Sequence, residues 1–110
     1  MELDLYQELQ EKIAELNKCI RSLRVNGTAY AEAERQYKIL LRQECLKLRD
    51  QGMAVTLIDK VCYGIPEVAE ARFQRNVAEA VYDANKEAIQ SIKLQMRLIE
   101  SQLQREWGQS

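Results

Sequence analysis

The sequence predicts an all-α fold: a helical hairpin, a short connecting helix and one long C-terminal helix in an elongated bundle. Apolar residues recur every three to four positions along most of the 110 residues. One proline and four glycines interrupt the chain, and none of these lies between Pro66 and Trp107. A strand-rich chain would need turn residues far more often. We therefore expect one helical domain over residues 1–110.

The first half of the chain predicts two amphipathic helices, over about residues 3–24 and 28–51. In the first, the intervals between apolar residues alternate between three and four, at Tyr6, Leu9, Ile13, Leu16, Ile20 and Leu23. Asn26-Gly27 is expected to end this helix with a glycine cap rather than to join two strands, because the flanking period is helical. Thr28 is the expected N-cap of the next helix, and Gln51-Gly52 its end. The short link makes the two an antiparallel hairpin.

The second half predicts a short helix over about 56–63 and a long one over about 66–106. Thr56 and Asp59 resemble a capping box. Gly64 is expected to end the short helix, and Pro66 to begin the long one. The apolar line of the long helix has a period near 3.75, so it drifts round the helix and can face different partners in its two halves.

The predicted lengths indicate self-association. Hairpin arms of about 35 Å cannot cover a helix of about 60 Å, and large uncovered apolar patches are unusual in monomers. We expect a homodimer or higher oligomer built on residues 89–107. For Trp107, contact with a foreign partner is an equal alternative. The expected interface residues are Ile92, Met96, Ile99, Leu103 and Trp107.

The residue types argue against catalysis. The chain has no histidine, which removes the commonest general base, Ser-His and Cys-His pairs and most zinc sites. Its scattered glycines form no phosphate-binding loop. We predict a non-enzymatic protein with no metal and no cofactor. Cys19, Cys45 and Cys62 lack CxxC spacing and are expected to be reduced.

Two lines of cations could contact an anionic partner, either a phosphate backbone or a nucleotide. The alternative is a solvated helix face with intrahelical ion pairs, such as Glu34 with Lys38. The candidate residues are Lys86, Lys93 and Arg97 on the long helix and Arg35, Lys38 and Arg42 on the second.

A third candidate is the corner around Tyr63, where Arg72 and Arg75 follow at the start of the long helix. It could form a ligand notch or a partner contact. In the alternative interpretation Phe73 belongs to the core and the two arginines lie at the surface.

Charge and hydropathy indicate a cytoplasmic protein. The formal net charge of -1 argues against a nucleic-acid coat. The acidic N-terminus does not resemble a secretory signal, and no run of 18 apolar residues predicts a membrane span.

A set of residues in the second half of the chain forms a recognisable pattern: Val55-Thr-Leu-Ile-Asp-Lys-Val61, Gly64, Val68-Ala69, Arg72, Arg75, Ala78-Glu-Ala80, Tyr82, Lys93-Leu-Gln-Met-Arg97 and Arg105-Glu-Trp-Gly108. With this pattern, residues 36–108 resemble small helical proteins of tailed phages and prophages of Gram-positive bacteria, often encoded among early genes. The resemblance implies an early factor that binds a host or anti-phage defence protein, such as a nuclease effector, in stoichiometric amounts. Two alternatives remain: a DNA-binding accessory of phage replication or recombination, and an oligomeric sponge for a nucleotide signal.

Overall fold

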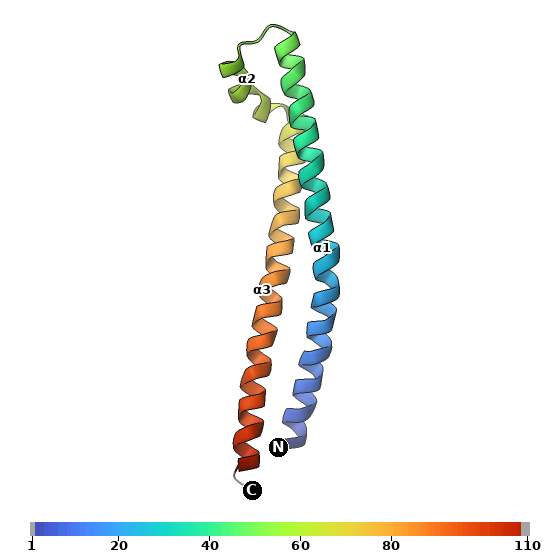
Figure 1. Cartoon of the computed structure of the whole chain (residues 1–110), viewed down its shortest axis with the longest axis vertical. Helices are drawn as coiled ribbons and strands as arrows, with labels where there is room; N and C mark the ends of the chain where they lie inside the picture. Colours follow the sequence, from blue (N-terminus) through green and yellow to red (C-terminus); the bar gives the residue numbers. More distant parts are fainter. Residues whose placement is uncertain (1, 109–110) are drawn as a thin grey trace. The chain divides into compact units, whose positions relative to one another are not determined.

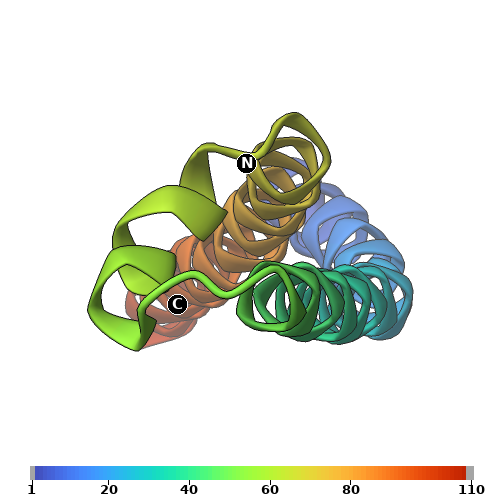
Figure 2. The same ribbon diagram turned by 90° about the horizontal axis from the view of Figure 1, so that it is seen from above.

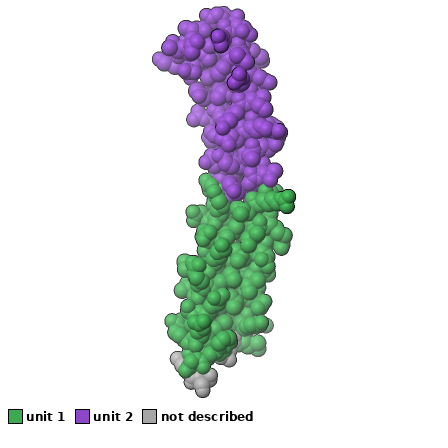
Figure 3. All heavy atoms as spheres, in the orientation of Figure 1, with its two compact units in different colours: residues 1–25, 83–110 green, residues 26–82 purple. Residues whose placement is uncertain are grey.

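The computed structural model describes residues 2–108, which contain helices and no strand (Figure 1). The elements are α1 (Glu2–Asp50), α2 (Val55–Val61), the 3-10 helix η1 (Cys62–Gly64) and α3 (Pro66–Gly108). The prediction of an all-α fold is confirmed. The chain divides into two compact units, which Figure 3 distinguishes by colour: unit 1 comprises residues 1–25 and 83–110, and unit 2 comprises residues 26–82.

The predicted break at Asn26-Gly27 is wrong, because α1 is a single helix of 49 residues. Gly27 does not adopt the left-handed conformation of a cap; within the described chain only Gly52 has a positive φ. A Cβ atom on Gly27 would instead lie 3.0 Å from Cε1 of Tyr82. Glycine inside a helix costs about 1 kcal/mol relative to alanine. Here it lets the Tyr82 ring pack directly on the backbone of α1, so the predicted hairpin of two shorter helices does not form.

The predicted end of α1 at Gly52 is confirmed. Gly52 has a φ of 87°. Its amide donates to the carbonyl of Arg49 at 3.0 Å, and the amide of Met53 donates to the carbonyl of Leu48 at 3.1 Å. These two bonds form a Schellman motif, in which glycine takes the left-handed position and the last carbonyls of the helix find donors.

The corner between α1 and α3 agrees with the sequence prediction only in part. The N-cap position of α2 is Ala54, with no side-chain cap, so the predicted capping box of Thr56 and Asp59 is wrong. The helix begins earlier than expected, and Thr56 lies inside its first turn. The short helix α2 ends at Val61 rather than at Gly64, which instead ends the 3-10 helix η1 that follows. Pro66 begins α3, as predicted. Proline suits this position because it lacks the amide hydrogen that a first-turn residue would leave unbonded.

In unit 2, the second half of α1 lies antiparallel to the first part of α3, and α2 and η1 lie beside this pair (Figure 2). Cys62 and Val68 are almost completely buried, at 1% and 0% exposure, and Tyr37 and Ile58 are also buried. The most deeply buried part of unit 2 is therefore where η1 meets the start of α3.

In unit 1, the first half of α1 lies antiparallel to the last part of α3 (Figure 1). Four apolar residues of α3 are buried there: Ile89, Ile92, Ile99 and Leu103. The side-chain amide of Asn85, 9% exposed, donates to the backbone carbonyl of Cys19 at 3.0 Å. A buried polar contact of this kind favours one register between the helices over its alternatives.

A double-mutant cycle tests the packing of Tyr82 on Gly27. We expect Gly27→Ala to stabilise a Tyr82→Ala chain by about 1 kcal/mol through helix propensity. In the native chain Gly27→Ala should give little or no gain in stability, because the added methyl group must displace the Tyr82 ring. Urea unfolding of the four variants measures this coupling. Equal destabilisation in both backgrounds would indicate a helix cap instead and would contradict the contact.

Candidate functional site

The residues predicted as the oligomer interface lie mostly inside unit 1. Ile92, Ile99 and Leu103 are 4%, 7% and 5% exposed because α1 covers this part of α3. Met96 is half-buried, and only Trp107 is exposed. The argument that a short hairpin arm leaves this half of α3 uncovered is wrong, since α1 does not stop at residue 24.

Apolar residues of α3 are exposed in both units: Leu94 and Leu98 of unit 1 are 52% and 62% exposed, and a longer row of exposed residues lies in the first half of α3, in unit 2. Phe73, Val77 and Val81 are 58%, 42% and 48% exposed. Their spacing of four places them along one side of the helix, and we call them the α3 stripe. The interpretation that Phe73 belongs to the core is wrong, because the covered side of α3 at this level carries Val68 and Arg75.

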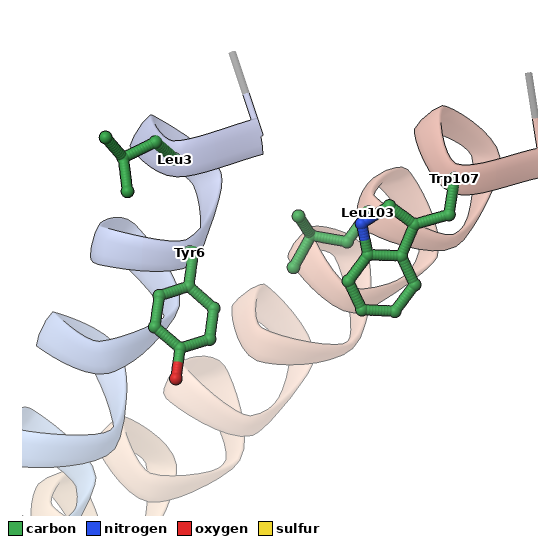
Figure 4. A pocket seen from close by; sticks show the side chains of 4 residues that line it. All are labelled: Leu3, Tyr6, Leu103 and Trp107. Carbon is green, nitrogen blue, oxygen red and sulfur yellow. The ribbon is translucent and has the colours of Figure 1, made fainter. Parts of the chain in front are cut away.

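An apolar hollow lies in unit 1 where the start of α1 meets the end of α3. It has a volume of about 290 Å³ and is lined by Leu3, Tyr6, Leu103 and Trp107. Figure 4 shows the Tyr6 ring and the Trp107 indole extending from facing helices, with Leu103 next to the indole. The sequence predicted Trp107 as a contact residue but did not indicate that Tyr6 would lie opposite it.

The structure separates the three residues predicted at the corner. The Arg72 guanidinium lies 5.5 Å from the centre of the Tyr63 ring, so this pair does form a cation–π contact. Arg75 points to a different place, 5.1 Å from the centre of the Tyr37 ring on α1. The corner therefore contains one of the two expected arginines.

Arg75 connects the two long helices inside unit 2. Its side chain is 21% exposed, and Nη1 lies 3.6 Å from Oε1 of Glu34. Its Nε donates to Oδ1 of Asn76 at 2.9 Å. Sequence reasoning missed this role, because nothing local to Arg75 indicates that Tyr37 and Glu34 approach it from α1.

The cations predicted to contact an anionic partner lie in both units, and several have carboxylate neighbours. Lys86 lies 3.2 Å from Asp83, and Lys38 lies 3.6 Å from Glu34, as the ion-pair interpretation predicted. Arg35 pairs with Glu32 and lowers the pKa of that carboxyl through a hydrogen bond and its positive charge. Arg42 and Arg97 are exposed.

Lys86 and Lys93 share one open hollow in unit 1, of about 340 Å³. One wall carries the two lysines and Gln90, and the remaining lining is apolar: Ile20, Leu23 and Ile89. The two lysines are seven residues apart, which is two helical turns, so both ammonium groups can reach one ligand in the hollow.

The cysteines have no disulfide partner in the structure: Cys19 and Cys45 are half-buried, and Cys62 is buried. Burial raises the pKa of the Cys45 thiol, and the neighbouring Cys62 thiol adds to this effect. A thiol with a raised pKa is a poor nucleophile at neutral pH, because the thiolate is the reactive form.

Two searches of residues 2–108 gave negative results. No three side chains of the cysteine and carboxylate type come together in a way that could hold a metal ion. No helix in the same range has both the length and the hydropathy needed to cross a membrane.

Comparison with known proteins finds no matching family model, no matching curated protein and no matching solved structure.

Replacing Arg75 tests its role between the helices. We expect Arg75→Ala to lower the free energy of unfolding by about 1–2 kcal/mol, because a partly buried cation–π contact and an ion pair are lost together. Arg72→Ala is the matched control. Its ring partner Tyr63 is 45% exposed, so its loss should cost about 0.5 kcal/mol. Urea unfolding measures the loss of stability in both variants. Equal losses would contradict the assigned role of Arg75 between the two helices.

Proposed function

We propose that this chain is a non-enzymatic protein that acts by binding other proteins stoichiometrically, with a second copy of itself as one of its partners. The observation that carries the proposal is the amount of uncovered surface. Sixteen large apolar side chains of the described residues are at least 37% exposed, Phe73, Val77 and Val81 of α3 among them. Contiguous exposed apolar side chains are typical of protein interaction surfaces.

The α3 stripe is the surface we assign to self-association. Each of its three side chains is large, apolar and at least 42% exposed. The exposed small residue Ala80 lies on the same side of the helix, and a small side chain allows a second helix to approach closely. Two copies that pack stripe against stripe would form a four-helix arrangement from two long helix pairs.

The resemblance to phage proteins supports a second kind of partner. It covers residues 36–108 and so includes the whole α3 stripe. We propose that the foreign partner is a host or anti-phage defence protein and that the chain inhibits it by occupying a surface. The place of action is then the cytoplasm of the infected bacterium. An inhibitor of this kind needs contact area rather than catalytic groups.

The hollow between Lys86 and Lys93 favours a second candidate function, the binding of an anionic small molecule. Its apolar lining could receive a base or another flat ring, and the two ammonium groups could hold a phosphate. Contact of the same lysines with DNA is the related alternative. The carboxylate of Asp83 lies close to Lys86 and offsets part of its positive charge. This weakens the case for a small anionic ligand and the case for DNA.

Native mass spectrometry of the tagged protein, purified from phage-infected Gram-positive cells, tests the proposal. We expect an even number of copies of the chain together with a second protein in an integer ratio. The double variant Phe73→Ser/Val77→Ser should appear as a single copy, because serine removes the apolar contact of the stripe. Ile39→Ser, which changes a residue of similar exposure on α1, is the control and should leave the copy number unchanged.

Three results would contradict this function. A single native copy with no retained protein removes both proposed partners. A retained nucleotide that is lost in a Lys93→Glu variant supports the small-molecule alternative. Retained DNA that dissociates at raised salt and in a Lys93→Glu/Arg97→Glu variant supports the accessory role in replication or recombination.

A further inference from the structure

Two apolar hollows meet at the end of unit 1 and share the side chains of Tyr6, Leu103 and Trp107. The hollow of about 290 Å³ extends from them toward Leu3. The other, of about 270 Å³, extends toward Leu9, Gln104 and Glu100. An engineered cavity of about 150 Å³ holds a benzene ring, so each hollow has room for a large apolar side chain.

The aromatic walls of these hollows are open to solvent. Tyr6 is 54% exposed and Trp107 is 59% exposed, while Leu103 between them is 5% exposed. In Figure 4 the two rings extend from α1 and α3, beside the buried leucine. Two partly exposed aromatic rings over an apolar floor resemble the pockets that receive anchor residues in protein interfaces.

The net charge of this end of unit 1 is acidic. Residues 3–11 and 99–108 contain one basic residue, Arg105, and five acidic ones, and Lys12 and Arg97 lie just beyond these ranges. Glu100 lines the second hollow directly. Glu106 follows it on α3, whereas Asp4, Glu8 and Glu11 lie on the side of α1 opposite Tyr6 by their helical spacing. A field of this sign attracts cations and repels phosphate groups and anionic lipid surfaces.

We propose that this end of unit 1 binds a cationic amphipathic segment of a partner protein. An apolar side chain of that segment enters between Tyr6 and Trp107. A lysine or arginine beside it pairs with the Glu100 carboxylate and lies against an aromatic face, where cations are favoured. The inference rests on the proposed function as a protein-binding protein and specifies where and by what chemistry a partner docks.

Trp107 provides a direct measurement, because it is the only tryptophan of the chain. The probes are two 12-residue helical peptides without aromatic residues: one of leucine and lysine, the other of leucine and glutamate with identical spacing. We expect the lysine peptide to shift the Trp107 emission to shorter wavelength with a dissociation constant in the micromolar range. The glutamate peptide should bind at least tenfold more weakly.

Three variants in the hollows and one control outside them test the location of the binding site. Tyr6→Ala and Glu100→Lys should each weaken the lysine peptide about tenfold, since one removes an aromatic wall and the other reverses the charge in the wall. Glu100→Gln should weaken it less. Ile39→Ser, in unit 2 and outside both proposed surfaces, should leave the affinity unchanged. Far-UV circular dichroism checks that each variant keeps its helix content.

The proposal is overturned if both peptides bind equally, if neither shifts the emission, or if Tyr6→Ala and Glu100→Lys bind as the native chain does. Its failure is distinct from failure of the proposed function. A partner that is still retained by Tyr6→Ala in the native mass spectra would preserve the function and reject this site. Selective binding of the lysine peptide, with no partner protein retained in the native mass spectra, would support this site and reject the proposed function.

Discussion

The contact between Gly27 and the Tyr82 ring is the constraint on which the rest of the structure depends. Because the ring lies where a side chain would otherwise stand, α1 can continue past Asn26-Gly27 while remaining packed against α3. One helix of 49 residues then supplies a partner for α3 in both units. Its second half covers the start of α3 in unit 2, and its first half covers the end of α3 in unit 1. A break at Gly27 would leave the end of α3 without that cover.

The way α1 packs along α3 explains which apolar residues of the line on α3 stay exposed to solvent. Phe73, Val77 and Ile92 belong to one apolar line with a period near 3.75, so the line turns slowly round the helix. In unit 1 the line faces α1, and Ile92 is buried; in unit 2 it faces away, and Phe73 is exposed. This one apolar line therefore faces the core in unit 1 and solvent in unit 2. The surface proposed for self-association and the hollow beside Trp107 consequently lie in different units and can be varied separately.

Sequence reasoning succeeded where local chemistry decides the structure. Gly52 ends α1 because glycine takes a positive φ there, and Pro66 begins α3 because proline suits the first turn. Sequence reasoning failed where a residue far along the chain determines the local structure. Nothing near Asn26-Gly27 indicates that Tyr82 will pack on it, and tertiary contact then overrides the local stop signal. The expectation that Ile99 and its neighbours are uncovered followed from that one error. The Arg75 contacts and the position of Tyr6 opposite Trp107 also require two helices to meet, so no local pattern contains them.

The continuity of α1 through Asn26-Gly27 is the central claim, and backbone chemical shifts of residues 24–30 in solution test it most directly. The structure requires helical ¹³Cα and ¹³C′ shifts at every one of these positions, with slow amide exchange on both sides of Gly27. Shifts typical of a turn at Asn26-Gly27, with fast exchange of the amides that follow, would mean that α1 is two helices. In that case the end of α3 would lose its cover, and both proposed surfaces would have to be assigned again.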